Sequence, residues 1–225
     1  MDTQEGQFYT FLLKEKTRAF FAFVLYVLFI VMIIEIDLPL AVDFIRFIIQ
    51  LFIILFYGTL YMSDWMDKYY ERKEGKLEKN TTQNIKKIGK EILMYIAIFL
   101  IVDGITSFVL VGQTDNQAKF EESFYKAPIL NSIFTIIICP IIEELIFRFL
   151  PYKFIKNKTL YIIVSGVVFA AIHVWGDSNP LYNIWFYMIR ALYYGYRYYK
   201  TKNLWIPISI HMTNNLIATL LFVFS

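Results

Sequence analysis

The sequence is poor in charge, in glycine, and above all in histidine and cysteine. Only 18% of its 225 residues are charged, and it contains 9 glycines, 2 histidines and 1 cysteine. A single cysteine excludes an intrachain disulfide, so cysteine usage gives no information on the redox compartment. In contrast, 58% of the residues are hydrophobic and 19% are aromatic. A water-soluble domain of this length could not bury that much apolar side chain in its own core.

The apolar residues occur in runs of roughly 20 residues, the length of α-helix that crosses a hydrocarbon layer. We therefore predict an all-α fold: a polytopic integral membrane helical bundle with about seven transmembrane helices. One membrane domain should cover residues 1–225, with two spans and a basic cytoplasmic loop in 1–91 and the core in 92–225. The predicted spans are 20–36, 42–62, 92–111, 129–150, 161–175, 181–199 and 204–224. No cleavage site follows the first span, so we expect it to stay in the chain.

Lysine and arginine predict the orientation of these spans. They precede the first span and follow the second, fourth and sixth, whereas the alternate loops are mainly acidic. Because basic loops stay in the cytoplasm, we expect a cytoplasmic N-terminus and an external C-terminus. The segment 63–91 mixes bases with acids, which favours an exposed connector over a site for anionic lipid. Richness in Ile, Lys, Asn and Phe indicates a low-GC bacterial source, so we expect a multi-pass protein of a bacterial plasma membrane.

Three apolar segments nevertheless contain ionisable residues, which are costly in lipid and usually mark functional sites. Glu144 and Arg148 are four residues apart and can form an ion pair on one helix face. Glu143 lies about 100° around the same helix and is free to meet a different neighbour. His173 shares a face with Phe169, and His211 shares one with Asn215. The three segments place these groups at overlapping depths, so we predict one shared site inside the membrane.

The three motifs, Glu143-Glu144-x-x-x-Arg148, Phe169-x-x-x-His173 and His211-x-x-x-Asn215, resemble those of the CPBP intramembrane proteases. This family includes the type II CAAX prenyl endopeptidases and the bacteriocin-processing or Abi proteins. The resemblance covers roughly the last hundred residues, and it departs from the common pattern at Phe149, where many members have glycine. It implies an intramembrane endopeptidase in which Glu143 and His173 activate water and His211 and Asn215 stabilise the oxyanion. Glu144, Arg148 and Phe169 would then support the site.

Whether a metal takes part is left open by the sequence. Glu143, His173 and His211 form a plausible three-ligand set for catalytic zinc. The same residues also serve a mechanism without metal, which we favour, because their spacing is not that of a His-Glu-x-x-His motif.

Two other functions compete with proteolysis. The Abi branch of the resemblance leaves room for a bacteriocin-immunity or membrane scaffold protein that binds a partner without cutting it. A transporter or channel is the third alternative, but the sequence lacks the interrupted or repeated spans that many transporters have. For a protease, the resemblance indicates a membrane-associated peptide or protein as substrate, such as a leader, bacteriocin or pheromone precursor. The expected surroundings are the lipid bilayer, with no nucleic-acid partner.

Further polar residues within the predicted spans need an explanation. Arg190 and Asp103 are expected to form a structural ion pair, with substrate binding by Arg190 as the alternative. Cys139 is expected to be a packing residue rather than a nucleophile. Pro140 should kink its helix beside the site, and the tyrosine-rich run 193–199 is typical of an interfacial aromatic belt.

Overall fold

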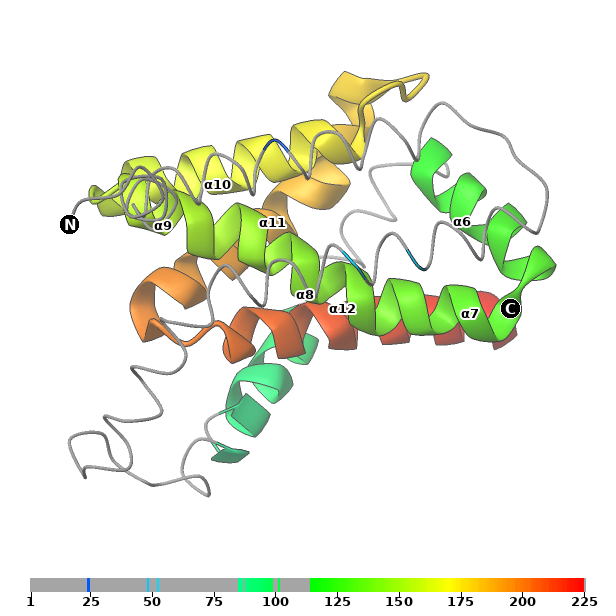
Figure 1. The fold of residues 1–225 in the computed structure, drawn as a ribbon, viewed down its shortest axis with the longest axis horizontal. Helices are drawn as coiled ribbons and strands as arrows, with labels where there is room; N and C mark the ends of the chain where they lie inside the picture. Colours follow the sequence, from blue (N-terminus) through cyan, green and yellow to red (C-terminus); the bar gives the residue numbers. More distant parts are fainter. Residues whose placement is uncertain are drawn as a thin grey trace, which may run out of the picture. The chain divides into compact units, whose positions relative to one another are not determined.

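The computed structural model describes residues 114–224, together with 85–86, 88–98, 101 and the single residues 24, 48 and 52 (Figure 1). The chain divides into two compact units, Met1–Thr81 and Thr82–Ser225. All the helices described below belong to the second unit. Apart from the three single residues, the predicted spans 20–36 and 42–62 lie outside the described residues. So do Asp103 and most of the predicted connector 63–91.

Every regular element among the described residues is helical, which confirms the predicted all-α class for this part of the chain. A helical stretch at 88–98 precedes the elements α6 Asp115–Lys126, α7 Pro128–Ile133, η1 Phe134–Ile138, α8 Cys139–Glu144, η2 Leu145–Phe149, α9 Leu150–Phe154, α10 Lys158–His173, α11 Pro180–Thr201 and α12 Trp205–Phe224. The last four predicted spans are thus helices whose bounds lie within a few residues of those expected. The total number of spans and the orientation stay predictions.

Helix α6 was not expected, because its polar residues resemble those of a loop between two spans. The side chain of Thr114 caps its first turn by accepting from the backbone N–H of Gln117 at 3.2 Å. A Lys126–Glu122 ion pair of 2.9 Å, one turn apart, stabilises its last turn. Lys126 also holds the pKa of the Glu122 carboxyl below its usual value through this hydrogen bond and its charge. Local capping and pairing therefore make a helix where hydrophobicity alone predicts none.

The turn between α10 and α11 is joined to the start of α6 by hydrogen bonds. Ser178 donates to both carboxylate oxygens of Asp115, from its backbone N–H at 2.8 Å and its hydroxyl at 3.1 Å. Burial raises the pKa of Asp177, but hydrogen bonds from the Asn183 amide and the Asn179 backbone hold it below its usual value overall. These bonds tie a polar turn to a neighbouring helix end.

Segments α7 to α9 follow one another without interruption over 128–154, and two of them, η1 and η2, are π-helical turns. Each π-helical turn ends two residues before a proline, Pro140 in the first case and Pro151 in the second. Proline has no N–H and clashes with the carbonyl four residues earlier. Inserting one extra residue into the preceding turn relieves this clash and keeps the helix continuous. Pro140 thus follows a widened, π-helical turn, while the kink predicted at this proline stays a prediction.

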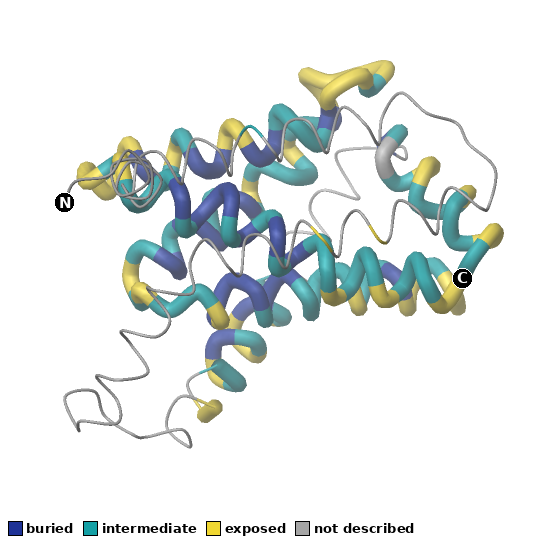
Figure 2. Tube along the Cα trace, viewed as in Figure 1, coloured by how far each residue is buried: buried dark blue, intermediate teal, exposed yellow. Residues whose placement is uncertain are grey.

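Burial is greatest where α8, η2, α10, α11 and α12 meet (Figure 2). Helices α10 and α11 approach closely at Gly166, where an added Cβ would lie 2.7 Å from Leu192 Cδ2 and 3.3 Å from the Leu192 backbone nitrogen. A larger residue here would force the Leu192 side chain to move and would press against its backbone, so glycine suits this close approach. This close approach brings the polar side chains of α10 toward η2 and α12.

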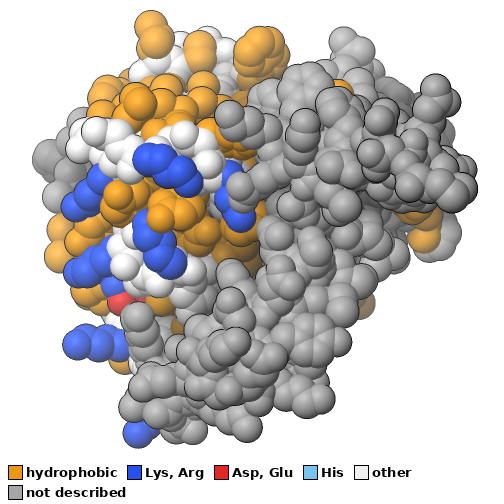
Figure 3. Space-filling model, turned by 60° about the vertical axis from the view of Figure 1, so that its left-hand side comes forward, with side chains coloured by type: hydrophobic (Ala, Val, Ile, Leu, Met, Phe, Trp, Pro, Cys, Tyr) orange, Lys and Arg blue, Asp and Glu red, His pale blue; other side chains and the backbone are white. Residues whose placement is uncertain are grey.

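The outer faces of the helices expose many large hydrophobic side chains, some of which are seen in the coloured part of Figure 3. Such extended apolar surface marks contact with lipid or with another protein. Among the described residues, α12 is the helix that is both long and apolar enough to cross a membrane, whereas α10 is apolar but shorter. The exposed hydrophobic residues of α10 to α12 include Leu160, Ile163, Val167, Leu181, Trp185, Ile189, Leu216, Leu220 and Leu221.

Lysine and tyrosine side chains gather where α9 and α11 end and α10 begins. The Lys202 ammonium lies 3.8 Å from the ring centre of Tyr152 and 3.6 Å from that of Tyr199. Lys158 and Lys200 both lie near the Tyr196 ring. The two predicted cytoplasmic loops, after α9 and after α11, are therefore neighbours in the fold, as positive-inside orientation requires.

Candidate active site

The side chains of Glu144 and Arg148 lie in the most buried part of the site, and both are 0% exposed. Arg148 Nε lies 3.1 Å from Glu144 Oε2, so the predicted ion pair is present. Arg148 Nη1 donates to the Ser165 hydroxyl at 3.0 Å and to the Ser165 carbonyl at 3.3 Å. The guanidinium also lies over the Phe169 ring, 4.8 Å from its centre. The buried Arg148 guanidinium needs several such contacts, because a buried charge without a partner would destabilise the fold.

Two side chains of α10 bind backbone carbonyls of the π-helical turn η2. The Ser165 hydroxyl donates to the Phe147 carbonyl at 2.6 Å, and the Tyr161 hydroxyl donates to the Arg148 carbonyl at 3.0 Å. Phe147 lies four residues before Pro151, which has no N–H to supply the usual helical donor. Ser165 satisfies that carbonyl, and so attaches α10 to the turn that holds Arg148.

His211 joins the ion pair from α12. Its Nδ1 lies 3.0 Å from Glu144 Oε1 and its Nε2 lies 3.6 Å from Glu143 Oε2. Because a carboxylate only accepts, Nδ1 carries the proton and donates to Glu144. The imidazole also stacks on Tyr194, with ring centres 5.0 Å apart and planes inclined by 29°. The ring is therefore fixed in both orientation and tautomer.

His173 approaches the same carboxylate from α10. Its Nδ1 lies 2.8 Å from the backbone carbonyl of Phe169, which can only accept, so this nitrogen carries the proton. Its Nε2 lies 3.8 Å from Glu143 Oε1. The His173 ring stacks on the Phe169 ring, with ring centres 4.1 Å apart. It also contacts the Tyr187 ring, whose centre is 4.9 Å away. Phe169 thus supports His173 through both its carbonyl and its ring.

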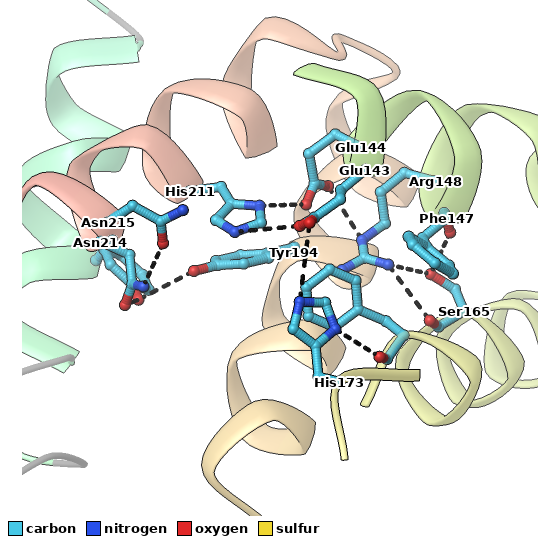
Figure 4. Close-up of polar contacts among 12 residues, drawn as sticks. Glu143, Glu144, Phe147, Arg148, Ser165, His173, Tyr194, His211, Asn214 and Asn215 are labelled. Carbon is cyan, nitrogen blue, oxygen red and sulfur yellow. Dashed lines mark hydrogen bonds and ion pairs between the residues drawn. The ribbon is translucent and has the colours of Figure 1, made fainter. Parts of the chain in front are cut away.

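Glu143 lies between the two histidines, and each of its carboxylate oxygens faces one Nε2 (Figure 4). Both separations exceed hydrogen-bond length, and Oε2 is buried without a hydrogen-bond partner among the described residues. The Glu143 side chain is 16% exposed, whereas that of Glu144 is fully buried. The adjacent carboxylates therefore occupy different surroundings: Glu144 is in close contact with Arg148 at 3.1 Å and His211 at 3.0 Å, whereas the nearest charged partners of Glu143 are 3.6 and 3.8 Å away.

Asn215 is close in sequence to His211 but is bound to a different helix. Its Nδ2 donates to the Thr135 carbonyl in η1 at 2.8 Å, and its Oδ1 accepts from Asn214 Nδ2 at 3.0 Å. One of its amide hydrogens is already used, which leaves the second for another acceptor. A continuous set of contacts links Glu143, Glu144, Arg148, Phe169, His173 and His211. Asn215 lies at the edge of this group (Figure 4).

The site contains residues that the motifs did not reveal, namely Ser165, Tyr161, Tyr194, Tyr95 and Asn214. Ser165 could have been found, because it lies four residues before Phe169 on the same helix face. Tyr194 and Tyr198 are only 1% and 5% exposed, so the predicted interfacial belt is wrong for these two residues. Because the whole run is rich in tyrosine, its composition does not distinguish the buried positions on α11 from the others.

The structure also bears on the predictions made for Arg190, for Cys139 and for a zinc ion. Arg190 Nη1 donates to the Phe186 carbonyl one turn earlier, while its predicted partner Asp103 lies outside the described residues. Cys139 is a free, partly buried thiol. Among the residues that the structure describes, no group of three His, Cys, Asp or Glu side chains could hold a metal ion. Whether zinc binds Glu143, His173 and His211 stays a prediction.

Comparison with known proteins finds one family model and two relatives that resemble this chain. Residues 125–217, which include all three motifs, match the model of the family described as type II CAAX prenyl endopeptidase Rce1-like. An uncharacterized protein of Mycoplasma capricolum is 29% identical over 163 residues, which are 65% of this chain and 48% of that protein. The protein of Bacillus subtilis named "Putative membrane peptidase YdiL" is 27% identical over 151 residues, which are 61% of this chain and 59% of that protein.

The chain thus spans about half to three-fifths of the length of these curated relatives. No solved structure matches. The membrane peptidase relative and the apolar helix α12 together place the protein in a membrane, and the family members are peptidases. Through residues 125–217, the chain is similar to the Rce1-like family of type II CAAX prenyl endopeptidases, which agrees with the resemblance of its three motifs to the CPBP proteins.

Proposed function

We propose that this protein is an intramembrane endopeptidase that hydrolyses a peptide bond of a membrane-associated peptide or protein. The observation that carries the proposal is the position of Glu143. Its two oxygens face His173 Nε2 at 3.8 Å and His211 Nε2 at 3.6 Å, and Oε2 has no hydrogen-bond partner among the described residues. A carboxylate that is held in place but not satisfied is suited to bind and deprotonate a water molecule.

In the proposed reaction, Glu143 accepts a proton from water while the water oxygen attacks the scissile carbonyl carbon. The carbonyl electron pair moves to its oxygen and forms a tetrahedral oxyanion. Because His173 Nδ1 holds its proton toward Phe169, a neutral His173 presents an unprotonated Nε2 toward Glu143. That nitrogen can accept a hydrogen bond from the same water. Collapse of the intermediate breaks the C–N bond, and the proton held by Glu143 passes to the leaving amine.

The oxyanion needs donors, and two groups on α12 can supply them. Asn215 retains one amide hydrogen after donating to Thr135. His211 donates from Nε2 only when its ring carries both protons, because Nδ1–H is already bound to Glu144. In a site that excludes water, such donors are worth far more than in bulk solvent. Glu144 and Arg148 have no role in bond breaking and fix the position of His211.

We further propose a multi-pass location in a bacterial plasma membrane and a short leader, bacteriocin or pheromone precursor as substrate. The apolar outer surface of α10 to α12 supports access of a substrate from the lipid side. A lipid-associated peptide would reach the site by lateral diffusion in the membrane.

The test is a comparison of membrane-associated peptides, by mass spectrometry, from cells that express the wild-type protein or Glu143→Gln. We expect at least one precursor to accumulate in the variant and its cleaved product to disappear. His173→Ala and His211→Ala should give the same precursor. Ser209→Ala serves as the control, because its hydroxyl makes no hydrogen bond with any described residue. If all three site variants, stably present in the membrane, leave the peptides unchanged, the proposal fails and a non-proteolytic immunity or scaffold function takes its place.

A further inference from the structure

A single-direction chain of hydrogen bonds runs through the end of the site next to Asn215 (Figure 4). The Tyr95 hydroxyl donates to Asn214 Oδ1 at 2.7 Å, Asn214 Nδ2 donates to Asn215 Oδ1 at 3.0 Å, and Asn215 Nδ2 donates to the Thr135 carbonyl at 2.8 Å. We call this chain from Tyr95 to Thr135 the amide chain. It connects the helical stretch 88–98, helix α12 and the π-helical turn η1.

The direction of the amide chain follows from its last member. A backbone carbonyl only accepts, so the group of Asn215 that faces Thr135 must be its NH2 group. The carbonyl oxygen of Asn215 then faces Asn214, which must present its own NH2 group, and its Oδ1 is left facing Tyr95. The Tyr95 hydroxyl must therefore donate. Reversing either amide would place two donors or two acceptors against each other.

The Thr135 carbonyl is available because of Pro140. In a regular α-helix this carbonyl would accept from the N–H of Cys139, but in η1 that N–H donates to Phe134 instead. The next residue, Pro140, has no N–H to donate. The π-helical turn and the proline together leave Thr135 without a backbone donor from its own helix. Asn215 of α12 supplies the missing hydrogen bond.

The other end of the amide chain contacts His211 through Tyr194. The Tyr95 and Tyr194 hydroxyl oxygens are 3.2 Å apart. Because the Tyr95 hydrogen is used for Asn214, Tyr194 is the donor in this pair. The Tyr194 ring stacks on the His211 imidazole at 5.0 Å between centres. Tyr95 is 2% exposed and Tyr194 is 1% exposed, so water does not compete for these bonds.

From this geometry we propose that Tyr95 is a positioning residue for the oxyanion donor Asn215. Its hydroxyl fixes the amide of Asn214, which fixes the amide of Asn215, so that one Asn215 hydrogen is bound to Thr135 and the other keeps a constant direction. The role rests on the proposed function. Donors that are fixed before reaction stabilise a developing oxyanion better than donors that must first reorient. Tyr95 lies outside residues 125–217, which match the family model.

The test uses Tyr95→Phe, which removes only the hydroxyl, with Tyr193→Phe as the matched control. Tyr193 packs against Tyr95 at 5.7 Å between ring centres, and its buried hydroxyl has no hydrogen-bond partner among the described residues. The substrate probe is a quenched fluorescent, palmitoylated peptide with the sequence of the precursor that accumulates in Glu143→Gln cells. We expect kcat of Tyr95→Phe to fall about tenfold with an unchanged KM, since complete loss of an oxyanion donor costs about 100-fold or more. Tyr193→Phe should retain the wild-type kcat.

A double variant separates positioning from a general effect on folding. In an Asn215→Ala background, Tyr95→Phe should lower kcat by less than about twofold, because a residue that acts through Asn215 has nothing left to position. A further tenfold loss there, or equal kcat for Tyr95→Phe and Tyr193→Phe in the wild-type background, would overturn the role of Tyr95. If instead no precursor depends on Glu143, the proposed function itself has failed, and this role falls with it.

Discussion

Glu143 and Glu144 are neighbours in sequence but belong to two regions of the site with opposite properties. The locked region consists of Glu144, Arg148 and Ser165, whose charged groups are fully buried and paired. The open region consists of Glu143, His173 and His211 Nε2, where the facing atoms are 3.6 to 3.8 Å apart. A buried charge in close contact with its counter-charge is held in place, and removing that counter-charge destabilises the fold, whereas a carboxylate without such a contact is available for chemistry.

His211 connects the two regions. Its Nδ1 belongs to the locked region through Glu144, and its Nε2 faces Glu143 in the open region. One imidazole therefore transmits the rigidity of the ion pair to the place where a substrate would react. The comparison predicts that damage to the locked region mainly affects stability, while damage to the open region mainly affects turnover.

The largest expected effects come from replacing glutamate by the isosteric glutamine at position 143 and, separately, at position 144. Glu144→Gln leaves the fully buried Arg148 guanidinium without its counter-charge, and we expect a loss of about 3–5 kcal/mol in the free energy of unfolding. Glu143→Gln should change stability by less than about 1 kcal/mol, because Glu143 has no tight partner to lose, and should abolish peptide processing. Thermal unfolding in detergent and the processing assay measure the two quantities on the same preparations.

The reverse result would remove the distinction between the two regions. If Glu143→Gln unfolds the protein while Glu144→Gln stays folded and inactive, the roles of the two carboxylates are exchanged. If both variants lose stability equally, the site is one structural cluster and the open region does not exist as a separate unit.

A smaller effect is expected at Ser165, which belongs to the locked region but carries no charge. Ser165→Ala removes one of the two acceptors of Arg148 Nη1, the hydroxyl, and leaves the buried Phe147 carbonyl without its side-chain donor. We expect a loss of about 1–3 kcal/mol in stability with kcat within about twofold of the wild type. Ser209→Ala, on α12, is the matched control. A large loss of kcat in folded Ser165→Ala protein would show that the locked region also controls turnover.

Much of the site could be predicted from the sequence because its residues recur at helical spacing. The Glu144–Arg148 pair follows from a four-residue separation on one helix. The convergence of His173 and His211 on Glu143 was inferred from the rarity of such groups in apolar segments. These inferences need only the geometry of a helix and the cost of burying charge.

The remaining contacts depend on how backbones depart from regular helices, and hydrophobicity does not report such departures. Pro140 was expected to disturb its helix, but nothing in the sequence states that the resulting free carbonyl belongs to Thr135 or that Asn215 would bind it. Tyr95 lies 119 residues from Asn214, so only tertiary packing brings them together. Helix α6 depends on a local cap and one ion pair, which an analysis based on apolar runs overlooks.

The smallest expected effect is that of removing metal. This experiment tests whether Glu143 is a free base, as the open region requires, or a metal ligand. If zinc were bound there, Glu143 would be a ligand and not a free base, and the contrast with Glu144 would disappear. The Nδ1 bonds of His173 to a carbonyl and of His211 to a carboxylate would orient the rings equally well for a metal. Purified protein treated with EDTA and 1,10-phenanthroline should therefore keep its rate of cleavage of the palmitoylated probe within about twofold, and elemental analysis should find far less than one zinc per chain. Loss of activity that zinc alone restores would make Glu143, His173 and His211 the ligands, because the neighbouring carboxylate of Glu144 is already held by Arg148 and His211.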